Sequence, residues 1–154
     1  MSKSHLDVRL HPSGVILRDR VRTEAIAEIQ TAIDEGQSSG PALCWTGRLS
    51  RHSCARSMPS SGGFVPRPAT GADLAKIWNV GTAACGAGQA YRYAKRLFSL
   101  FDLVVEFPEM ARERLEFTTP VRIHPSDAHL VIYRLEGHGV EIIRALHGHQ
   151  NLTA

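Results

Sequence analysis

Three segments near the C-terminus have the composition of β-strands, and they limit the possible folds more than any other feature. They run from Pro120 to Pro125, Ala128 to Glu136 and Gly139 to Gly148, and they are rich in β-branched and aromatic residues. The stretch "EGHG" between the last two predicts a tight hairpin. In the middle segment, alternation separates two sets of side chains, Leu130, Ile132 and Arg134 on one face and Val131, Tyr133 and Leu135 on the other. We therefore expect an antiparallel sheet.

Two helices are predicted ahead of these strands. Thr70 has the side chain of an N-cap, with Asp73 at the capping-box position, and Leu74, Ile77 and Trp78 follow at helical spacing. The glycines of "GTAACGAG" predict a turn between residues 81 and 88. A longer amphipathic pattern then continues to about residue 105. A helical hairpin packed on a small antiparallel sheet is an α+β architecture.

A short edge strand is expected just before the first of these helices, in "FVPRPAT". Its two prolines lack the backbone N–H that a central strand needs, so the segment belongs at the edge of a sheet.

The front of the chain predicts one more helix, from Val15 to Glu35, with Gly36 as a plausible stop. Ile26, Ile29 and Ile33 recur along one narrow apolar stripe. Such a helix has little reason to persist alone in water, so it needs a partner groove. The residues after it, up to Gly63, are dense in Ser, Gly, Arg and Pro and predict an irregular linker.

Composition excludes several classes of protein. The chain has 154 residues and a formal net charge of +3, which is too small to bind nucleic acid through bulk charge. Any such contact requires a local cluster of arginines. No apolar run is long enough to span a membrane and no signal peptide is evident, so a soluble, cytoplasmic protein is expected. The three cysteines are Cys44, Cys54 and Cys85; without a CxxC pair or a fourth ligand, they favour free thiols over a zinc site.

The polar residues with useful chemistry gather in the predicted strands. They are Arg122, His124, His129, Tyr133, Arg134, Arg144, His147 and His149. Guanidinium groups on an open sheet match phosphate oxygens, and a histidine there can move a proton near neutral pH. Alternatively, the arginines only solubilise the outer face of the sheet. "HGH" lacks metal-ligand spacing and a neighbouring acid, and no phosphate- or dinucleotide-binding loop is present, so neither a metal nor a cofactor is expected.

Taken together, "ADLAKIW", "GQAYRYAKRLFSLFDLVVEFPEM" and "VRIHPSDAHLVIYRLEGHGVEIIRALHG" resemble the ParE toxins of the RelE/ParE superfamily. The resemblance covers about Phe64 to Gly148 and implies a toxin-like domain at residues 63–154. The resemblance implies a toxin of a plasmid-stabilising type II toxin–antitoxin system that inhibits DNA gyrase and blocks replication. It also implies a functional surface that comprises Arg122, Tyr133, Arg134, Arg144 and His147, with no nucleophile or base assigned. After His147 the chain departs from the family pattern H-G-R-x-D. Two alternatives remain open: an endoribonuclease like RelE, and an inactive fusion remnant.

The front of the chain is similar to the C-terminal helix of ParD antitoxins, through "RTEAIAEIQTAIDEGQSSGPA". The resemblance implies an antitoxin-like segment at residues 1–42, joined by a linker at 43–62 to the toxin-like domain. Ile26, Ile29 and Ile33 are then the antitoxin-helix contacts. Too few residues precede the helix for a ribbon-helix-helix domain, so direct DNA binding of that kind is not expected. A tether of about 20 residues holds the helix at an effective concentration near millimolar, which predicts self-inhibition.

Overall fold

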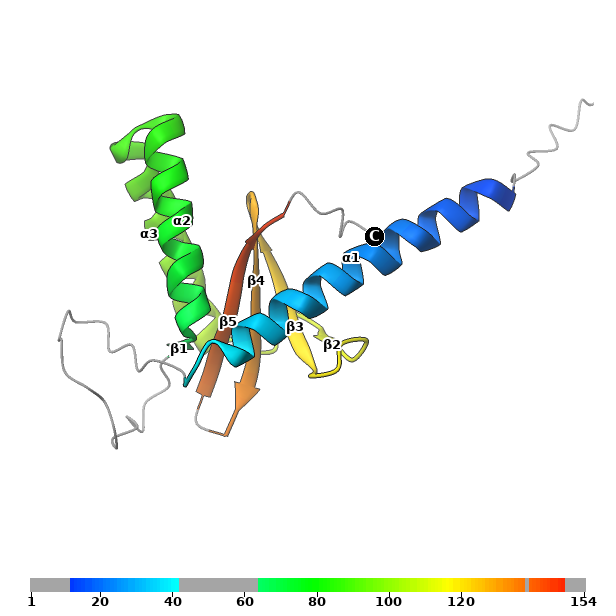
Figure 1. Ribbon diagram of the computed structural model, residues 1–154. Helices are drawn as coiled ribbons and strands as arrows, with labels where there is room; N and C mark the ends of the chain where they lie inside the picture. The colour runs from blue at the N-terminus through cyan, green and yellow to red at the C-terminus, as the bar shows by residue number, and fades with distance from the viewer. Residues whose placement is uncertain (1–11, 42–63, 138, 149–154) are drawn as a thin grey trace, which may run out of the picture.

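The computed structural model describes residues 12–41, 64–137 and 139–148, and Figure 1 shows how their elements are arranged. Within these ranges the helices are α1 (Pro12–Ser38), α2 (Pro68–Cys85) and α3 (Ala87–Glu106). The strands there are β1 (Phe64–Pro66), β2 (Glu113–Arg114), β3 (Val121–Ser126), β4 (His129–Glu136) and β5 (Gly139–His147). These strands form one sheet in the order β1-β5-β4-β3-β2.

The sheet is covered on both faces. The α2–α3 hairpin packs against one face, while α1 crosses the other and extends past the sheet with its N-terminal turns (Figure 1). The expected α+β fold, a helical hairpin on a small sheet preceded by an extra helix, is confirmed. One detail differs, because β1 lies at the edge as predicted but runs parallel to β5, so the sheet is mixed. The two strands are far apart in the sequence, and no local pattern specifies their relative direction.

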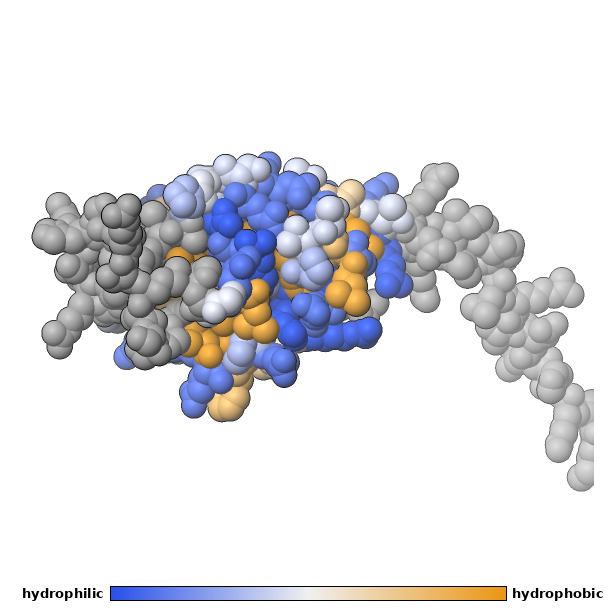
Figure 2. Space-filling view, turned by 90° about the horizontal axis from the view of Figure 1, so that it is seen from below, coloured by the Kyte–Doolittle hydropathy of each residue, from blue (hydrophilic) through white to orange (hydrophobic). Residues whose placement is uncertain are grey.

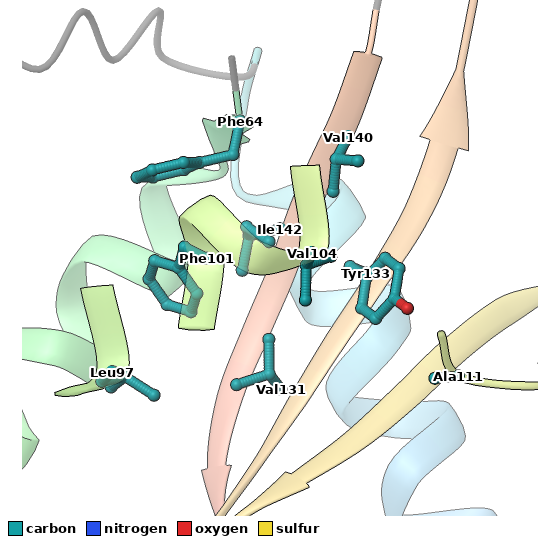
Figure 3. Packing of buried hydrophobic residues seen from close by; sticks show 9 residues of the cluster. All are labelled: Phe64, Leu97, Phe101, Val104, Ala111, Val131, Tyr133, Val140 and Ile142. Carbon is teal, nitrogen blue, oxygen red and sulfur yellow. The ribbon is translucent and has the colours of Figure 1, made fainter. Parts of the chain in front are cut away.

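The larger hydrophobic core lies between the sheet and the α2–α3 hairpin (Figure 3). Its buried members are Phe64, Leu97, Phe101, Val104, Ala111, Val131, Tyr133, Val140 and Ile142. The ring of Phe101 meets that of Phe64 edge-on, with centroids 5.2 Å apart. Val131 and Tyr133 face this core and Ile132 faces the opposite side, so the alternation predicted for β4 is confirmed.

The start of α2 differs from the predicted capping box. The helix begins at Pro68, a residue favoured at the first helical position, and Thr70 is buried inside its first turn. The Thr70 hydroxyl donates a hydrogen bond to the carbonyl of Ile142 on β5, 2.8 Å away. Thr70 is therefore not an N-cap, and Asp73 is free to interact with another element. The predicted glycine turn is confirmed, but it is confined to Gly86, whose φ of 84° suits a residue without a side chain.

Strand β5 contains one extra residue relative to β4. Tyr133 pairs with Ile142, whereas Ile132 pairs with Arg144, so Ile143 is the inserted position of a β-bulge. A bulge turns neighbouring side chains away from strict alternation. Ile143 packs on the α1 side of the sheet, and the next residue, Arg144, also reaches α1.

Several sequence-based predictions lie outside the described residues. They concern the irregular linker at 43–62, Cys44, Cys54 and His149. Cys85, the cysteine within the described ranges, is an exposed free thiol at the end of α2. In the described part of the chain, no helix combines the length and apolar character that a membrane span requires.

The surface seen from below Figure 1 is largely polar, with apolar side chains showing at several separate places (Figure 2). Apolar side chains on this face are therefore not gathered in one patch.

Candidate functional site

The face of the sheet that α1 covers is the first part of the candidate site. We call Phe117, Val121, Ile132 and Ile143, all buried there, the α1-binding face. Ile29 and Ile33 of α1 are 1% and 0% exposed and pack directly on it, and Ile26 lies partly buried beside them. Full burial of one isoleucine stabilises the packed state by about 1.5–3 kcal/mol. The three isoleucines named from the sequence thus occupy the contact between α1 and the sheet.

Gly36 lets α1 approach β5 closely. A Cβ atom at this position would lie 2.6 Å from Cγ2 of Ile143 and 2.9 Å from its carbonyl oxygen. The helix continues to Ser38, so the prediction that Gly36 ends the helix is wrong. The glycine is needed for close packing instead of chain termination.

Arg144 joins three elements at the edge of this contact. Its Nε and Nη2 donate to the two carboxylate oxygens of Asp73 on α2, at 2.7 and 3.0 Å. Its Nη1 donates to Glu35 of α1 at 2.9 Å and to the carbonyl of Ala32 at 3.3 Å. The hydrogen bonds with Asp73 raise the pKa of Arg144 above its ordinary value, so the guanidinium stays charged.

The Asp73 carboxylate also fixes the backbone of β5, since the N–H of Ala145 donates to it at 3.0 Å. Asp73 therefore positions the Arg144 side chain and holds the strand that carries it. Paired in this way, Arg144 presents little free charge to a target while α1 is in place.

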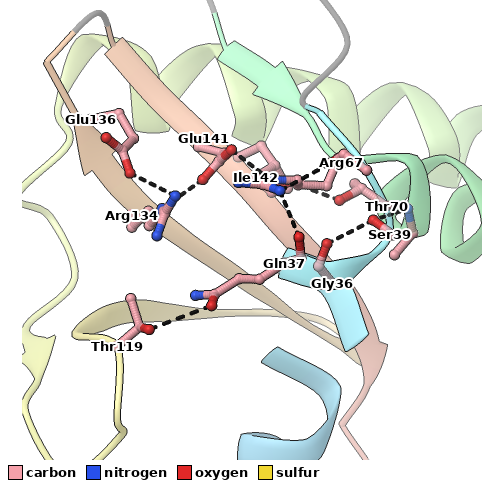
Figure 4. Close-up of polar contacts among 12 residues, drawn as sticks. Gly36, Gln37, Ser39, Arg67, Thr70, Thr119, Arg134, Glu136, Glu141 and Ile142 are labelled. Atoms are coloured by element: carbon pink, nitrogen blue, oxygen red, sulfur yellow. Dashed lines mark hydrogen bonds and ion pairs between the residues drawn. The ribbon is translucent and has the colours of Figure 1, made fainter. Parts of the chain in front are cut away.

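A second polar network lies at the C-terminal end of α1 (Figure 4). Arg67 donates from Nη1 to the carbonyls of Gln37 and Gly40, at 2.7 and 2.9 Å. Its Nε donates to Glu141 at 2.6 Å. Carbonyls at a helix C-terminus lack intrahelical partners, and a cation there satisfies them.

Glu141 carries the network on to β4. Its carboxylate, only 4% exposed, accepts from both Arg67 and Arg134, and Arg134 also pairs with Glu136 at 2.6 Å. The two arginines compensate the negative charge on the buried carboxylate of Glu141. Arg134 is accordingly paired with two carboxylates of the same domain.

Two further contacts join α1 to the loop before β3. The amide N–H of Thr118 donates to Oε1 of Gln30 at 2.9 Å. The Thr119 hydroxyl donates to Oε1 of Gln37 at 3.4 Å. Polar contacts thus flank the apolar stripe of α1 along its length, which fixes how the helix sits on the sheet.

Arg122 and Tyr133 serve mainly to hold a loop. They face each other across β3 and β4. Arg122 donates to the carbonyl of Ala111 at 2.7 Å, and the Tyr133 hydroxyl donates to that of Pro108 at 3.0 Å. Tyr133 is fully buried, and this burial raises the pKa of its hydroxyl. A buried ring in the core cannot contact a target directly.

His147 lies in a cleft of about 540 Å³ between the α2–α3 hairpin and the end of β5, which Asp73 and Arg144 also line. We call it the histidine cleft. Its ring contacts that of His129, the residue opposite it on β4, with centroids 4.9 Å apart. The Tyr93 hydroxyl lies 2.5 Å from Nδ1 of His129. Lys76 and Arg96 line the same cleft, so it combines proton-carrying groups with cations.

Burial lowers the pKa of His129 below its usual 6.5, and the neighbouring His147 lowers it further. Burial likewise raises the pKa of Tyr93, with Asp127 adding to the effect. Near neutral pH the imidazole of His129 is therefore neutral and can accept a proton.

The five candidate residues do not form one cluster. Arg144 and His147 both line the histidine cleft, whereas Arg122 and Tyr133 hold the 108–111 loop and Arg134 lies in the Glu141 network. Asp73, Glu35, Arg67 and Tyr93 were not identified from the sequence. For Asp73 the local sequence predicts a helix cap, because its partner Arg144 lies 71 positions away and is not part of the local pattern.

Within the described ranges, no three His, Cys, Asp or Glu residues are arranged to hold a metal ion.

Comparison with known proteins identifies the family. Toxin ParE1 of Caulobacter vibrioides is 36% identical over 83 residues, covering 54% of this chain and 85% of the relative. Toxin ParE3 of the same organism is 32% identical over 88 residues, covering 57% and 87%. A solved chain of the chromosomal ParDE TA system from P. aeruginosa covers 57% of this chain and 97% of that chain, with 16% identity and a TM-score of 0.49.

The family model described as "ParE toxin of type II toxin-antitoxin system, parDE" matches residues 66–152, from the last residue of β1 to beyond the end of β5. This span contains the α2–α3 hairpin, the Arg144–Asp73 pair and the histidine cleft. With more than half of the chain matched, and two ParE toxins covered over most of their length, the chain belongs to the ParE toxin family of type II toxin–antitoxin systems.

Proposed function

We propose that the chain is a ParE-type toxin that inhibits DNA gyrase in the cytoplasm, and that α1 acts as a built-in antitoxin helix. The single observation that carries the second part is the burial of Ile29 and Ile33 on the α1-binding face. A helix on this face also occupies Arg144 through Glu35. While α1 is bound, a target cannot contact the α1-binding face, and Arg144 is already paired with Glu35.

The contacts of α1 combine two features of a specific interface. An apolar centre excludes water, and polar contacts surround it, here from Arg144, Arg67 and the Thr118 amide. Since α1 belongs to the same chain, its local concentration at the sheet exceeds that of a free antitoxin at ordinary cellular levels. A ParD-like antitoxin acting in trans would have to displace α1 first.

The test uses the full chain with Ile29→Asp and Ile33→Asp, which put two charges into the apolar contact. The matched control is Ala27→Asp and Thr31→Asp, with the same helix, spacing and added charge at exposed positions. We expect growth arrest and inhibition of gyrase supercoiling with the first variant, and neither with the control or the wild type.

The outcomes separate the two parts of the proposal. If the wild type arrests growth as strongly as the Ile29/Ile33 variant, self-inhibition is wrong but the toxin assignment stands. If the variant arrests growth while gyrase remains fully active, the gyrase target is wrong. If the variant remains folded, as shown by circular dichroism, yet is harmless, the chain is an inactive fusion.

Endoribonuclease activity is a second candidate, favoured by the histidine cleft. Tyr93, His129 and His147 lie in contact there, with Lys76 and Arg96 on the same walls. A neutral imidazole can take the proton of a ribose 2′-hydroxyl, and cations can hold the phosphate. RNA cleavage by the Ile29/Ile33 variant, abolished by His129→Gln, supports this candidate; intact RNA after prolonged incubation excludes it.

A further inference from the structure

Three cations line a shallow hollow on the outer face of α3. The hollow is formed by Gln89, Arg92, Lys95, Arg96 and Ser99, which recur at helical spacings of three and four. We call these five residues the α3 basic stripe. All five are exposed, and the opposite side of α3 provides Leu97 and Phe101 to the core. The stripe is therefore a solvent-facing surface, and only Gln89 and Arg96 among its residues also line the histidine cleft.

No ion pair within α3 compensates the charges on this stripe, although Arg96 lies over the ring of Tyr93, 5.7 Å from its centroid. At the positions three and four residues away from each cation, α3 has only uncharged residues or another cation. Arg92 and Arg96 are themselves four residues apart, a spacing at which like charges repel. The acidic residues of α3, Asp102 and Glu106, lie near its C-terminus, which is the less favourable end for negative charge.

Compensation from other elements is weak. Arg96 lies 3.5 Å from Asp127, but both side chains are more than half exposed. An ion pair in such a position contributes less than about 1 kcal/mol. A bound anion would relieve the repulsion among the three cations, which gives the stripe a reason to bind one.

We propose that the α3 basic stripe binds the phosphate backbone of nucleic acid without sequence preference. Arginine, lysine, glutamine and serine are the side chains that contact phosphate oxygens in such complexes. The hollow lacks the aromatic or apolar anchor that a protein partner usually requires at the centre of its interface. Nucleic acid therefore fits this lining better than an acidic protein does.

The stripe is independent of the proposed self-inhibition. It belongs to α3, on the hairpin side of the sheet, whereas α1 covers the opposite face (Figure 1). Nucleic acid binding through the stripe is thus expected with α1 in place. Gln89 and Arg96 also line the histidine cleft, so the test rests on Arg92 and Lys95, which do not.

The experiment measures binding of the full chain to a short labelled DNA duplex by fluorescence anisotropy at several salt concentrations. The test variant is Arg92→Gln with Lys95→Gln, which leaves the contacts of Arg96 intact. The control, Arg112→Gln with Arg114→Gln, removes the same net charge from the segment around β2, where Arg112 is exposed and Arg114 is half-exposed and pairs with Glu116. Thermal unfolding verifies that all three proteins are folded.

The logarithm of the affinity falls linearly with the logarithm of the salt concentration, and each cation that contacts phosphate makes this slope steeper by about 0.9. Removal of two such cations should make the slope shallower by about 1.8. A rise from about 50 to 200 mM salt should then weaken the wild-type complex about 12-fold more than the variant complex. The control should keep the wild-type slope.

Three results would overturn the proposal. The first is an unchanged slope in the Arg92/Lys95 variant, and the second is an equal decrease in the control, which indicates bulk charge alone. The third is displacement of the duplex by a poly-glutamate peptide of equal charge at the same concentration as by unlabelled duplex, which indicates an acidic protein partner instead.

Discussion

Arg144 and Asp73 form a two-point ion pair across the junction between β5 and α2, with Nε–Oδ2 and Nη2–Oδ1 distances of 2.7 and 3.0 Å. Both side chains are largely shielded from water, at 14% and 12% exposed. Bidentate geometry of this kind combines strength with a fixed orientation. Arg144, which the sequence predicts to belong to the functional surface, is therefore held by a carboxylate of the same domain.

Asp73→Asn should destabilise the protein by about 3 kcal/mol, because it leaves the Arg144 guanidinium shielded without its carboxylate. Asparagine keeps the size of the side chain, so packing is conserved. Urea unfolding measures the loss. Glu35→Gln is the comparison, since Glu35 is 65% exposed and should cost less than about 1 kcal/mol. Equal losses of unfolding free energy for the two variants would contradict a larger contribution of Asp73 than of Glu35.

Gly36→Ala should destabilise the protein by about 1–3 kcal/mol, even though alanine favours helix, since the new methyl group overlaps the Ile143 backbone. Gly71→Ala is the matched control within α2, where a Cβ atom meets nothing within 4 Å. That substitution should stabilise by about 0.5–1 kcal/mol. A shift of the two melting temperatures in the same direction would argue against close packing of α1 on β5.

Ile33→Ala should cost about 2–5 kcal/mol, the range for truncation of a fully buried isoleucine. The partly exposed Leu103 offers a control, and its change to alanine should cost less than about 1 kcal/mol. The same denaturant titrations report both. If α1 were only loosely attached to the sheet, the two variants would behave alike.

Stability should decrease as the pH falls from about 7.5 to 5, in part through His129. The pKa of His129 in the folded state is below its usual 6.5. The unfolded chain therefore binds a proton at a pH where the folded chain does not, and acid favours unfolding. This contribution is complete above pH 6.5 and is lost between the unfolded and folded pKa values. His129→Gln should show a smaller difference in unfolding free energy between the two pH values; an unchanged difference would exclude His129 as a source.

Tyr133→Phe should lower the free energy of unfolding by about 1 kcal/mol by removal of the hydrogen bond to the Pro108 carbonyl. Since the ring is buried, toxicity of the Ile29/Ile33 variant should persist when this change is added. Abolished toxicity in a stable triple variant would return Tyr133 to the functional surface.

The elements of the fold that depend on periodicity were predictable. The stripe of Ile26, Ile29 and Ile33 requires an apolar partner, and the alternation in β4 divides its side chains between two faces. Both patterns are local, so they can be read without knowledge of the tertiary structure.

The pairing of distant side chains was not predictable, and the bulge at Ile143 shows why. From a tight hairpin, simple counting pairs His129 with Leu146, whereas the inserted residue pairs it with His147. Likewise, Glu35 and Asp73 lie 38 positions apart, and only the packing of α1 and α2 around β5 brings both to one guanidinium.

Arg67 bonds to α1 through Nη1 and to Glu141 through Nε, so departure of the helix leaves the second bond in place. Glu141 in turn retains Arg134, and Asp73 retains Arg144. The surface beneath α1 is thus preorganised, because these ion pairs do not involve α1 and hold the charged groups in place when the helix leaves. Another helix of matching shape can then bind to the same surface. Exchange of one helix for another then requires little rearrangement of the domain, and its rate should be governed by how quickly α1 detaches.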